Sequence, residues 1–378
     1  MIGRLKFNID GIVTDIINKI PDNVWDNPNA TFLDPAMGGG QFVKAIEQKL
    51  RELGYSDENI HSRVFGLESN TMRVNFTENK YKLVGNYSVA DFLNWETSMK
   101  FDVIVGNPPY QTQVGPSKTE PMWDKFVKQS FEILNDDGYL ALIHPSGWRN
   151  VDGRFTDVRD LLLSKQMEYL EIHNEKDGLQ TFGAETRYDW YVVKNTPKKN
   201  KNTMVKFEDG IQNNINLSEL PFIPNHSYNK IASFVAEPEQ ESVKVLYSRS
   251  FYETRKQYVS KTQSKKFKYP VVYTVNSKSD PIFYWSSVNN HGHFGIPKLI
   301  WSNGRISSVG SYIDVQGECG LTQFAYAIVD TPKNLNQIKK AFDSKEFREL
   351  MYACSVGQLM INYKIISTFR KDFWKEFV

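Results

Sequence analysis

A short, mostly apolar run at residues 101–106 stops at two consecutive prolines, Pro108 and Pro109. A β-rich run that ends in this way predicts a buried parallel strand with a rigid loop at its carboxyl end. In open α/β sheets, ligands bind at this end of the strands. We therefore expect an α/β fold with a binding site where this strand ends.

The loop itself, Asn107-Pro108-Pro109-Tyr110, holds two hydrogen-bond acceptors close together. They are the side-chain oxygen of Asn107 and the carbonyl of Pro108, and the prolines restrict both residues. An NH₂ group that donated to both acceptors would be drawn from planar toward tetrahedral, which frees its lone pair for attack on an electrophile. Tyr110 adds a flat face for a base lifted out of its stack. The plainer interpretation is a strand-ending turn with a half-buried tyrosine.

A glycine-rich segment, residues 34–40, lies between a predicted strand at 31–34 and a predicted helix at 41–50. Such a loop lets the backbone approach a ligand closely, and the helix N-terminus favours negative groups. Asp34 would repel a pyrophosphate but would suit the ammonium group of an amino acid. The segment therefore favours S-adenosylmethionine (SAM) over a dinucleotide.

Carboxylates recur at the ends of the next two predicted strands. Glu68 ends residues 63–68, where it could accept hydrogen bonds from ribose hydroxyls. Asp91 follows residues 82–88, where it could accept from the adenine amine while Phe92 lies against the ring. Each carboxylate alone is more often a cap or a solvated turn, so the signal is their ordered recurrence.

Strands and helices alternate along the first half of the chain. The later strands are predicted at 139–145, 167–172 and 188–194, and helices at 7–20, 122–134 and 155–164. This alternation predicts a mostly parallel, doubly wound sheet.

Together these residues resemble the SAM-dependent DNA adenine-N6 methyltransferases. The segment Asp34-Pro35-x-x-Gly38-x-Gly40 precedes the Asn107–Tyr110 loop, an order similar to the γ-type enzymes of the Eco57I-like and TaqI-like groups. The usual Thr-Pro signature before the first strand is missing, and Gly39-Gly40-Gln41 replaces the commoner Gly-Ser-Gly. The resemblance implies a seven-stranded methyltransferase sheet in a catalytic domain at 1–196. A second, mixed α+β domain at 197–378 would recognise the DNA target.

The resemblance also implies a role for each site residue. Phe182 occupies the place of a phenylalanine that contacts the target adenine in this family. The cofactor residues would be Asp34, Gly38 and Gly40 at the methionine part of SAM, Glu68 at the ribose, and Asp91 and Phe92 at the adenine. The flipped base would meet the catalytic residues Asn107, Pro108, Pro109 and Tyr110.

The second half of the chain is basic. Residues 197–378 carry 25 Lys and Arg against 16 Asp and Glu, whereas residues 1–196 carry 21 against 28. This asymmetry is expected if the second half meets a polyanion such as double-stranded DNA, although surface charge also drifts without such a cause. Cations and aromatics interleave over residues 247–269, a composition that suits phosphates and stacked bases.

Other segments of the second half have simpler predictions. Residues 197–202 are a candidate linker, and a short strand with a turn at 297–305 could place Asn303 or Arg305 near base edges. Amphipathic helices are predicted at 335–352 and 359–369.

Several classes of protein are disfavoured. Two cysteines, Cys319 and Cys354, are too few for a disulfide framework or a cysteine-based zinc site, and His291-Gly292-His293 lacks further ligands. No apolar run is long enough for a membrane span and the start is no signal peptide, so we expect a cytoplasmic location. The roughly 30 residues before the first strand leave little room for a fused nuclease. We expect a stand-alone methylase, monomeric or homodimeric, with any cognate restriction endonuclease on a separate chain.

The predicted function is transfer of a methyl group from SAM to an adenine flipped out of duplex DNA. Two alternatives stay open. The same loop could present an RNA adenine or a protein glutamine, since both carry a planar NH₂ group. A DNA-binding protein could also keep this fold without activity.

Overall fold

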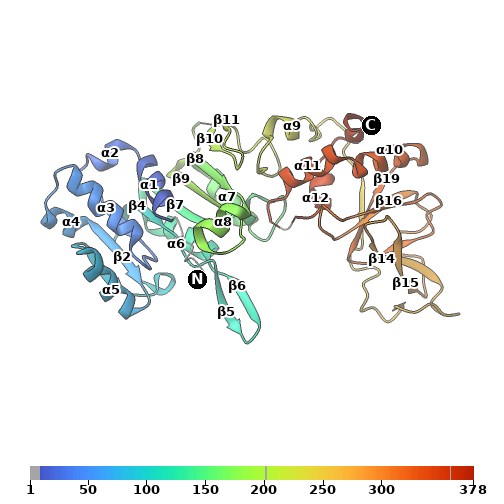
Figure 1. The fold of residues 1–378 in the computed structure, drawn as a ribbon, viewed down its shortest axis with the longest axis horizontal. Coiled ribbons are helices and arrows are strands. Elements are labelled where there is room, and N and C mark those ends of the chain that lie inside the picture. Colours follow the sequence, from blue (N-terminus) through green and yellow to red (C-terminus); the bar gives the residue numbers. More distant parts are fainter. Residues whose placement is uncertain (1–8, 201, 358) are drawn as a thin grey trace, which may run out of the picture. The chain divides into compact units, whose positions relative to one another are not determined.

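The computed structural model describes residues 9–200, 202–357 and 359–378. By its internal contacts the chain divides into two compact units, Met1–Glu219 and Leu220–Val378 (Figure 1). The first unit therefore continues past residue 196, where the sequence pattern placed a boundary.

The first unit is built on a nine-stranded sheet in the order β11-β10-β8-β9-β7-β4-β1-β2-β3. Neighbouring strands from β7 to β3 run parallel, and β9 runs antiparallel to both β7 and β8. The predicted α/β class with a mostly parallel sheet is confirmed. The strands are β1 (Phe32–Asp34), β2 (Val64–Glu68), β3 (Asn86–Val89), β4 (Phe101–Gly106), β7 (Leu134–Pro145), β8 (Lys165–His173), β9 (Tyr188–Pro197), β10 (Thr203–Lys206) and β11 (Gln212–Ile215).

The seven strands expected from the sequence form one continuous block of this sheet, and two more extend it. Strand β10 pairs with β8, and β11 pairs with β10. The prediction of a linker at residues 197–202 was wrong: Pro197 ends β9 and Thr203 begins β10, within one sheet. Lys201 of this segment lies outside the described residues.

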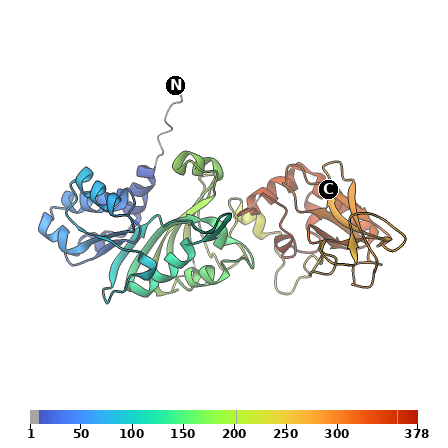
Figure 2. The same ribbon diagram turned by 90° about the horizontal axis from the view of Figure 1, so that it is seen from below.

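Helices cover both faces of the sheet (Figure 2). Ile12, Val13, Ile16 and Ile17 of α1 are buried in a core cluster that also contains Val103 and Val105 of β4. Since side chains alternate along a strand, Ile104 faces the opposite side. The elements are α1 (Ile9–Lys19), α2 (Asp22–Trp25), α3 (Gln41–Glu52), α4 (Asp57–Arg63), α5 (Thr71–Tyr81), η1 (Phe92–Asn94), α6 (Trp123–Ile133), η2 (Ser146–Arg149), α7 (Thr156–Ser164) and α8 (Glu175–Phe182).

Two features of the first unit differ from the sequence pattern. The third strand begins at Asn86 rather than residue 82, because Lys82 adopts a left-handed conformation (φ 53°) that ends α5. A hairpin of β5 (Gln111–Gly115) and β6 (Lys118–Pro121) follows Tyr110 and forms a separate two-stranded sheet. In Figure 1 this hairpin points away from the body of its unit.

The second unit is mixed α+β, as expected. Its two four-stranded sheets have the orders β12-β19-β16-β17 and β13-β15-β14-β18. The strands are β12 (Val245–Tyr247), β13 (Val259–Ser260), β14 (Tyr269–Val275), β15 (Pro281–Ser286), β16 (Lys298–Ser302), β17 (Ser311–Asp314), β18 (Gly320–Leu321) and β19 (Ala325–Val329). The helices are α9 (Tyr228–Ala232), α10 (Pro332–Asp343), α11 (Lys345–Cys354), α12 (Tyr363–Ile366) and η3 (Phe373–Glu376).

The helix predicted at residues 335–352 is in fact two helices, α10 and α11. Ser344 between them is extended, and its side chain accepts a hydrogen bond from the backbone N–H of Phe347. A serine in this conformation is a favourable N-cap, so it starts a new helix instead of continuing the old one. The helix predicted at 359–369 is reduced to α12, which Asn362 caps in the same way.

Within the described residues, we find no helix with the length and apolar character that crossing a membrane requires.

Candidate active site

The ends of β1 and β4 approach each other closely at Gly106. A Cβ atom added to Gly106 would lie 2.9 Å from Oδ1 of Asp34 and 3.2 Å from Cδ of Pro35. The first distance is shorter than real Cβ contacts and the second is tight, so glycine allows this approach without a shift of Asp34 or Pro35. The fold therefore brings the glycine-rich loop after Asp34 against the loop that begins at Asn107.

One cavity at this edge of the sheet, of about 290 Å³, has acidic residues in its wall. We refer to it as the acidic cavity. Its lining includes Gly38, Glu68, Asp91, Phe92, Asn107 and Pro109.

A second cavity, of about 640 Å³, has aromatic walls, and we refer to it as the aromatic cavity. Its lining includes Asn107, Pro108, Pro109, Tyr110, Trp123 and Phe182. Asn107 and Pro109 line both cavities. A group passing from a molecule in one cavity to a molecule in the other would therefore pass Asn107.

Two of the predicted cofactor residues lie behind the acidic cavity instead of lining it. Asp34 is 1% exposed, and its Oδ1 accepts a hydrogen bond from the backbone N–H of Ala36 (3.0 Å). Gly40 has φ 77° at the start of α3, where an added Cβ would lie 2.1 Å from Cγ2 of Thr77. These two residues shape the loop, while Gly38 reaches the cavity surface.

The carboxyl group of Asp34 has an unusual pKa. The pKa of Asp34 is raised from 3.8 to about 7 in total. Burial is the largest cause and raises the pKa, the hydrogen bond from the Ala36 N–H lowers it, and the nearby charge of Glu68 raises it. A cationic group close to Asp34 would favour the ionised form and reverse this shift.

Glu68 and Asp91 each combine a local hydrogen bond with a place in the cavity wall. Oε1 of Glu68 accepts from the backbone N–H of Asn70 (2.9 Å), and its Oε2 lies 3.8 Å from Nη1 of Arg73. Asp91 caps η1 by accepting from the backbone N–H of Leu93 (3.1 Å). The cap that the sequence offered as the plainer role of Asp91 therefore coexists with its position at the cavity.

Two polar atoms of the Asn107–Tyr110 loop are buried without a partner among the described residues. They are Oδ1 of Asn107 and the hydroxyl of Tyr110. Leaving a buried polar atom unpaired costs about 1–3 kcal/mol, so a ligand that hydrogen-bonds to these atoms would gain affinity. Burial also raises the pKa of Tyr110, which keeps its hydroxyl protonated and able to donate.

Phe182, the last residue of α8, faces Tyr110 across the aromatic cavity. The two rings are edge-to-face with centroids 6.1 Å apart. Tyr188 supports Phe182 from behind (centroids 4.9 Å apart) and stacks on His173. The sequence analysis did not identify Tyr188 or His173, although the aromatic density at residues 188–191 was a signal of a packed wall.

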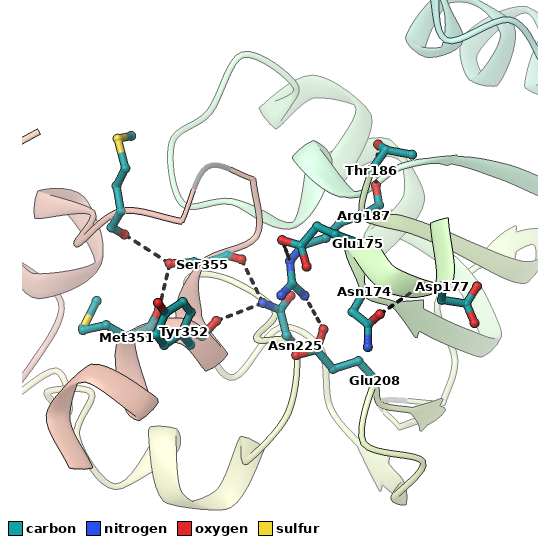
Figure 3. A network of polar contacts seen from close by, with 11 residues as sticks. Asn174, Glu175, Asp177, Thr186, Arg187, Glu208, Asn225, Met351, Tyr352 and Ser355 are labelled. Atoms are coloured by element: carbon teal, nitrogen blue, oxygen red, sulfur yellow. Dashed lines mark hydrogen bonds and ion pairs between the residues drawn. The ribbon is translucent and has the colours of Figure 1, made fainter. Parts of the chain in front are cut away.

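A buried arginine also holds α8 in place. Nε of Arg187 donates to Oε1 of Glu175 (2.8 Å) in the first turn of α8, and its Nη1 pairs with Glu208 (Figure 3). Arg187 is 8% exposed. The helix that ends in Phe182 is thus anchored at its start by charge and at its end by aromatic packing.

Comparison with known proteins matches the segment that carries most of this site. Residues 45–182 match the family model described as "Eco57I restriction-modification methylase". Over these residues the chain is therefore similar to the restriction-modification methylases, and we call residues 45–182 the methylase domain because of this likeness. The match includes Glu68, Asp91, the Asn107–Tyr110 loop and Phe182, and it begins after the glycine-rich loop.

Two curated relatives extend the likeness of the methylase domain. The chain is 24% identical over 212 residues to the type II methyltransferase M.CvrRI of Paramecium bursaria Chlorella virus XZ-6E, covering 52% of this chain and 53% of that protein. It is 26% identical over 195 residues to the modification methylase CviBIII of Paramecium bursaria Chlorella virus NC1A, covering 48% and 47%. The chain thus spans about half the length of the curated relatives that it matches.

One solved structure resembles the fold over nearly the whole chain. It is the type IIG restriction endonuclease BpuSI, with a TM-score of 0.50, 10% sequence identity, and coverage of 97% of this chain and 60% of that chain. At this identity the likeness concerns the fold alone.

The candidate DNA-reading residues lie outside the methylase domain, in the second unit. Asn303 and Arg305 are exposed, as are Lys261, Lys265, Lys266 and Lys268. The guanidinium of Arg249 lies over the ring of Tyr247, 5.1 Å from its centroid. This surface offers cations beside aromatic faces, as the sequence predicted for the stretch at 247–269.

One histidine and both cysteines of the second unit belong to its interior. His293 is buried, and burial lowers its pKa to about 4. Cys319 and Cys354 are buried free thiols. Among the residues that the structure describes, no group of three or more His, Cys, Asp or Glu side chains could hold a metal ion.

Proposed function

We propose that this chain is a SAM-dependent DNA methyltransferase that methylates the N6 amine of an adenine flipped out of the duplex. The observation that carries the proposal is the meeting of two cavities at Asn107, whose buried Oδ1 has no partner among the described residues. The methylase-domain match supports the reaction class, and the basic composition of residues 197–378 supports DNA as the partner.

The acidic cavity fits the parts of SAM. Gly38 leaves room for the amino-acid end, Glu68 offers carboxylate oxygens to ribose hydroxyls, and Asp91 with Phe92 suits an adenine ring. The buried carboxyl group of Asp34 would ionise beside the positively charged amino-acid end of the cofactor, because a nearby cation lowers its pKa. When bound, SAM supplies an electrophilic methyl group.

The aromatic cavity fits a flipped base. Tyr110 and Phe182 offer faces for the ring, while Oδ1 of Asn107 and the carbonyl of Pro108 accept the two hydrogens of the amine. The amine lone pair would form the new N–C bond as the S–C bond to the methyl group of SAM breaks and leaves its electron pair on sulfur, and the amine would then lose one proton to solvent. Positioning and electrostatics supply the catalysis, and this chain forms no covalent intermediate.

The matched family model is described as a restriction-modification methylase, and the two relatives are named as a type II methyltransferase and a modification methylase. We propose a restriction-modification setting for this chain as well. It would act on DNA as a monomer or homodimer, without a metal.

The test is to incubate the protein with radiolabelled SAM and unmethylated genomic DNA, and with RNA and cell protein in parallel. The DNA is then digested and the labelled nucleoside identified. We expect label in N6-methyl-deoxyadenosine with the wild-type protein and none with Asn107→Ala. Label in RNA adenine or protein glutamine alone would overturn DNA as the substrate. Failure to bind SAM would favour an inactive fold.

A further inference from the structure

The β5–β6 hairpin begins directly after the catalytic loop. Gln111 and Pro121 pair across its base, and both line the aromatic cavity. The backbone N–H of Met122 donates to the carbonyl of Tyr110 (3.1 Å), which closes the base of the hairpin against the loop. A group that contacts the base of the hairpin therefore also meets the mouth of the cavity.

We propose that this hairpin enters the DNA duplex beside the target adenine and fills the space that the flipped base leaves. This inference rests on the proposed function, since it concerns how the same site reaches its base.

Among the described residues, the hairpin makes no core packing contacts that would account for its stability. No residue from 111 to 121 is buried, and β5 and β6 pair only with each other. An isolated two-stranded hairpin is at best marginally stable in water. Its open faces gain contacts only from a partner outside the unit's own core.

The side chains of the hairpin suit the interior of a duplex more than its phosphates. Val114 lies at an irregularity in the pairing and is 47% exposed, and Pro116 follows in the turn. Apolar side chains of this kind act as wedges between base pairs in proteins that open or kink DNA. Lys118 is paired with Glu120 at 2.7 Å, so the hairpin adds little net charge for phosphate binding. Gln111 and Gln113 expose amide groups that can meet base edges.

The length of the hairpin matches this role. Five residues of β5 at a rise of about 3.4 Å each extend roughly 15 Å from the cavity mouth. DNA grooves are about 8 Å deep, so the turn at Pro116 and Ser117 can reach past the base edges.

The test compares two DNA substrates that carry the mapped methylation site. In one the target adenine is paired, and in the other it faces an abasic site. Flipping an unpaired base costs less, so the second substrate needs less help to open. The variants are Val114→Ser and a shortened hairpin with an Asn-Gly turn in place of residues 113–119. The matched control is Ile211→Ser, since Ile211 is an apolar residue of the same unit that is 56% exposed beside β11.

We expect both hairpin variants to lose about tenfold or more in kcat/KM on the paired substrate and to stay within about threefold of wild type on the abasic substrate. SAM affinity stays at the wild-type value, and the control variant keeps both rates. As a binding readout without turnover, 2-aminopurine at the target position becomes bright with wild type and stays dim with the shortened hairpin.

Other outcomes would overturn the inference. Equal losses on both substrates would show that the hairpin acts on the cavity, and unchanged rates on both would show that it binds something other than this DNA. A failure of the proposed function is distinct, because the wild-type protein would then methylate neither substrate.

Discussion

The imidazole ring of His173 stacks on the ring of Tyr188, with centroids 4.4 Å apart and planes within 6°. Two carboxylates face the imidazole. Its Nδ1 lies 3.4 Å from Oδ1 of Asp177, and its Nε2 lies 3.3 Å from Oε1 of Glu171, an ionic contact without hydrogen-bond alignment. Burial lowers the pKa of His173, but these carboxylates outweigh burial and raise it to about 9. A charged histidine therefore stacks on Tyr188, and Tyr188 in turn packs against Phe182.

This arrangement predicts a stability that depends on alkaline pH. The folded pKa of about 9 lies above the ordinary value of 6.5, so the contribution of His173 is complete below pH 6.5 and is lost as the pH rises through about 9. We expect the melting temperature of His173→Gln to fall less steeply than that of wild type over this window. Hydrogen exchange in α8 should rise over the same range in wild type.

The matched control is His61→Gln, because His61 is exposed and the one hydrogen bond described for its imidazole is to the backbone carbonyl of Val84. It should keep the wild-type slope. Parallel slopes for wild type and His173→Gln would contradict the stabilising role of the charged imidazole. Both facing carboxylates stay ionised throughout, since the pKa of Glu171 and that of Asp177 are each lowered to about 2. Lys206 also pairs with Glu171 (2.8 Å).

Asp34 predicts a trade between stability and cofactor binding. Its folded pKa of about 7 lies above the ordinary 3.8, so its contribution to stability declines as the pH rises from about 4 through 7. We expect Asp34→Asn to melt at a higher temperature than wild type at pH 8 without cofactor, with a smaller difference at pH 5. The variant should bind SAM more weakly by calorimetry, because the neutral amide cannot attract a cation. At pH 8 the melting temperature of Asp177→Asn should instead be lower than that of wild type, because His173 holds Asp177 in its ionised form. A less stable Asp34→Asn at pH 8 would argue that its charge is already compensated.

From the close contacts around Gly106, we predict that adding a single methyl group at this position lowers the unfolding free energy. In Gly106→Ala the new Cβ meets the carboxyl group of Asp34 and the ring of Pro35, so the Asp34 side chain or the loop that carries it must shift. We expect a loss of about 1–3 kcal/mol in unfolding free energy by denaturant titration, together with weaker SAM binding. Gly115→Ala is the control, because nothing lies within 4 Å of its added Cβ. Equal stability of the two variants would show that the loops yield without strain.

Asn107 predicts a separation of activity from stability. Its buried Oδ1 has no partner among the described residues, so Asn107→Ala removes no internal hydrogen bond of that atom and should not lower the unfolding free energy. Turnover should fall by about 10²-fold or more, because an acceptor for the reacting amine is lost. SAM affinity should stay within about threefold of wild type. Asn79→Ala, an exposed change on α5, controls for general effects. Full activity of Asn107→Ala would remove the basis of the proposed mechanism.

Much of the site's position followed from the sequence, because parallel strands deliver their carboxyl ends to one edge of a sheet. The alternation of strands and helices implied such a sheet, so Asp34, Glu68, Asp91 and Asn107 were expected at a common edge. The structure brings them there, with Glu68, Asp91 and Asn107 in the wall of one cavity and Asp34 behind it.

Only the tertiary structure decided which of these residues line each of the two cavities. That Asn107 and Pro109 line both cavities depends on the close approach at Gly106, which joins residues about 70 positions apart. The support of Phe182 by Tyr188 and His173 joins α8 to two strands and has no local signal.

The same reason explains the misplaced elements. Residues 203–215 join the first sheet through pairing with β8, which no local pattern encodes. The break at Ser344 depends on a cap, and a serine inside a helical pattern reads equally well as a surface position. Local periodicity determined the class of the seven central strands of the first sheet, and long-range packing determined which segments meet.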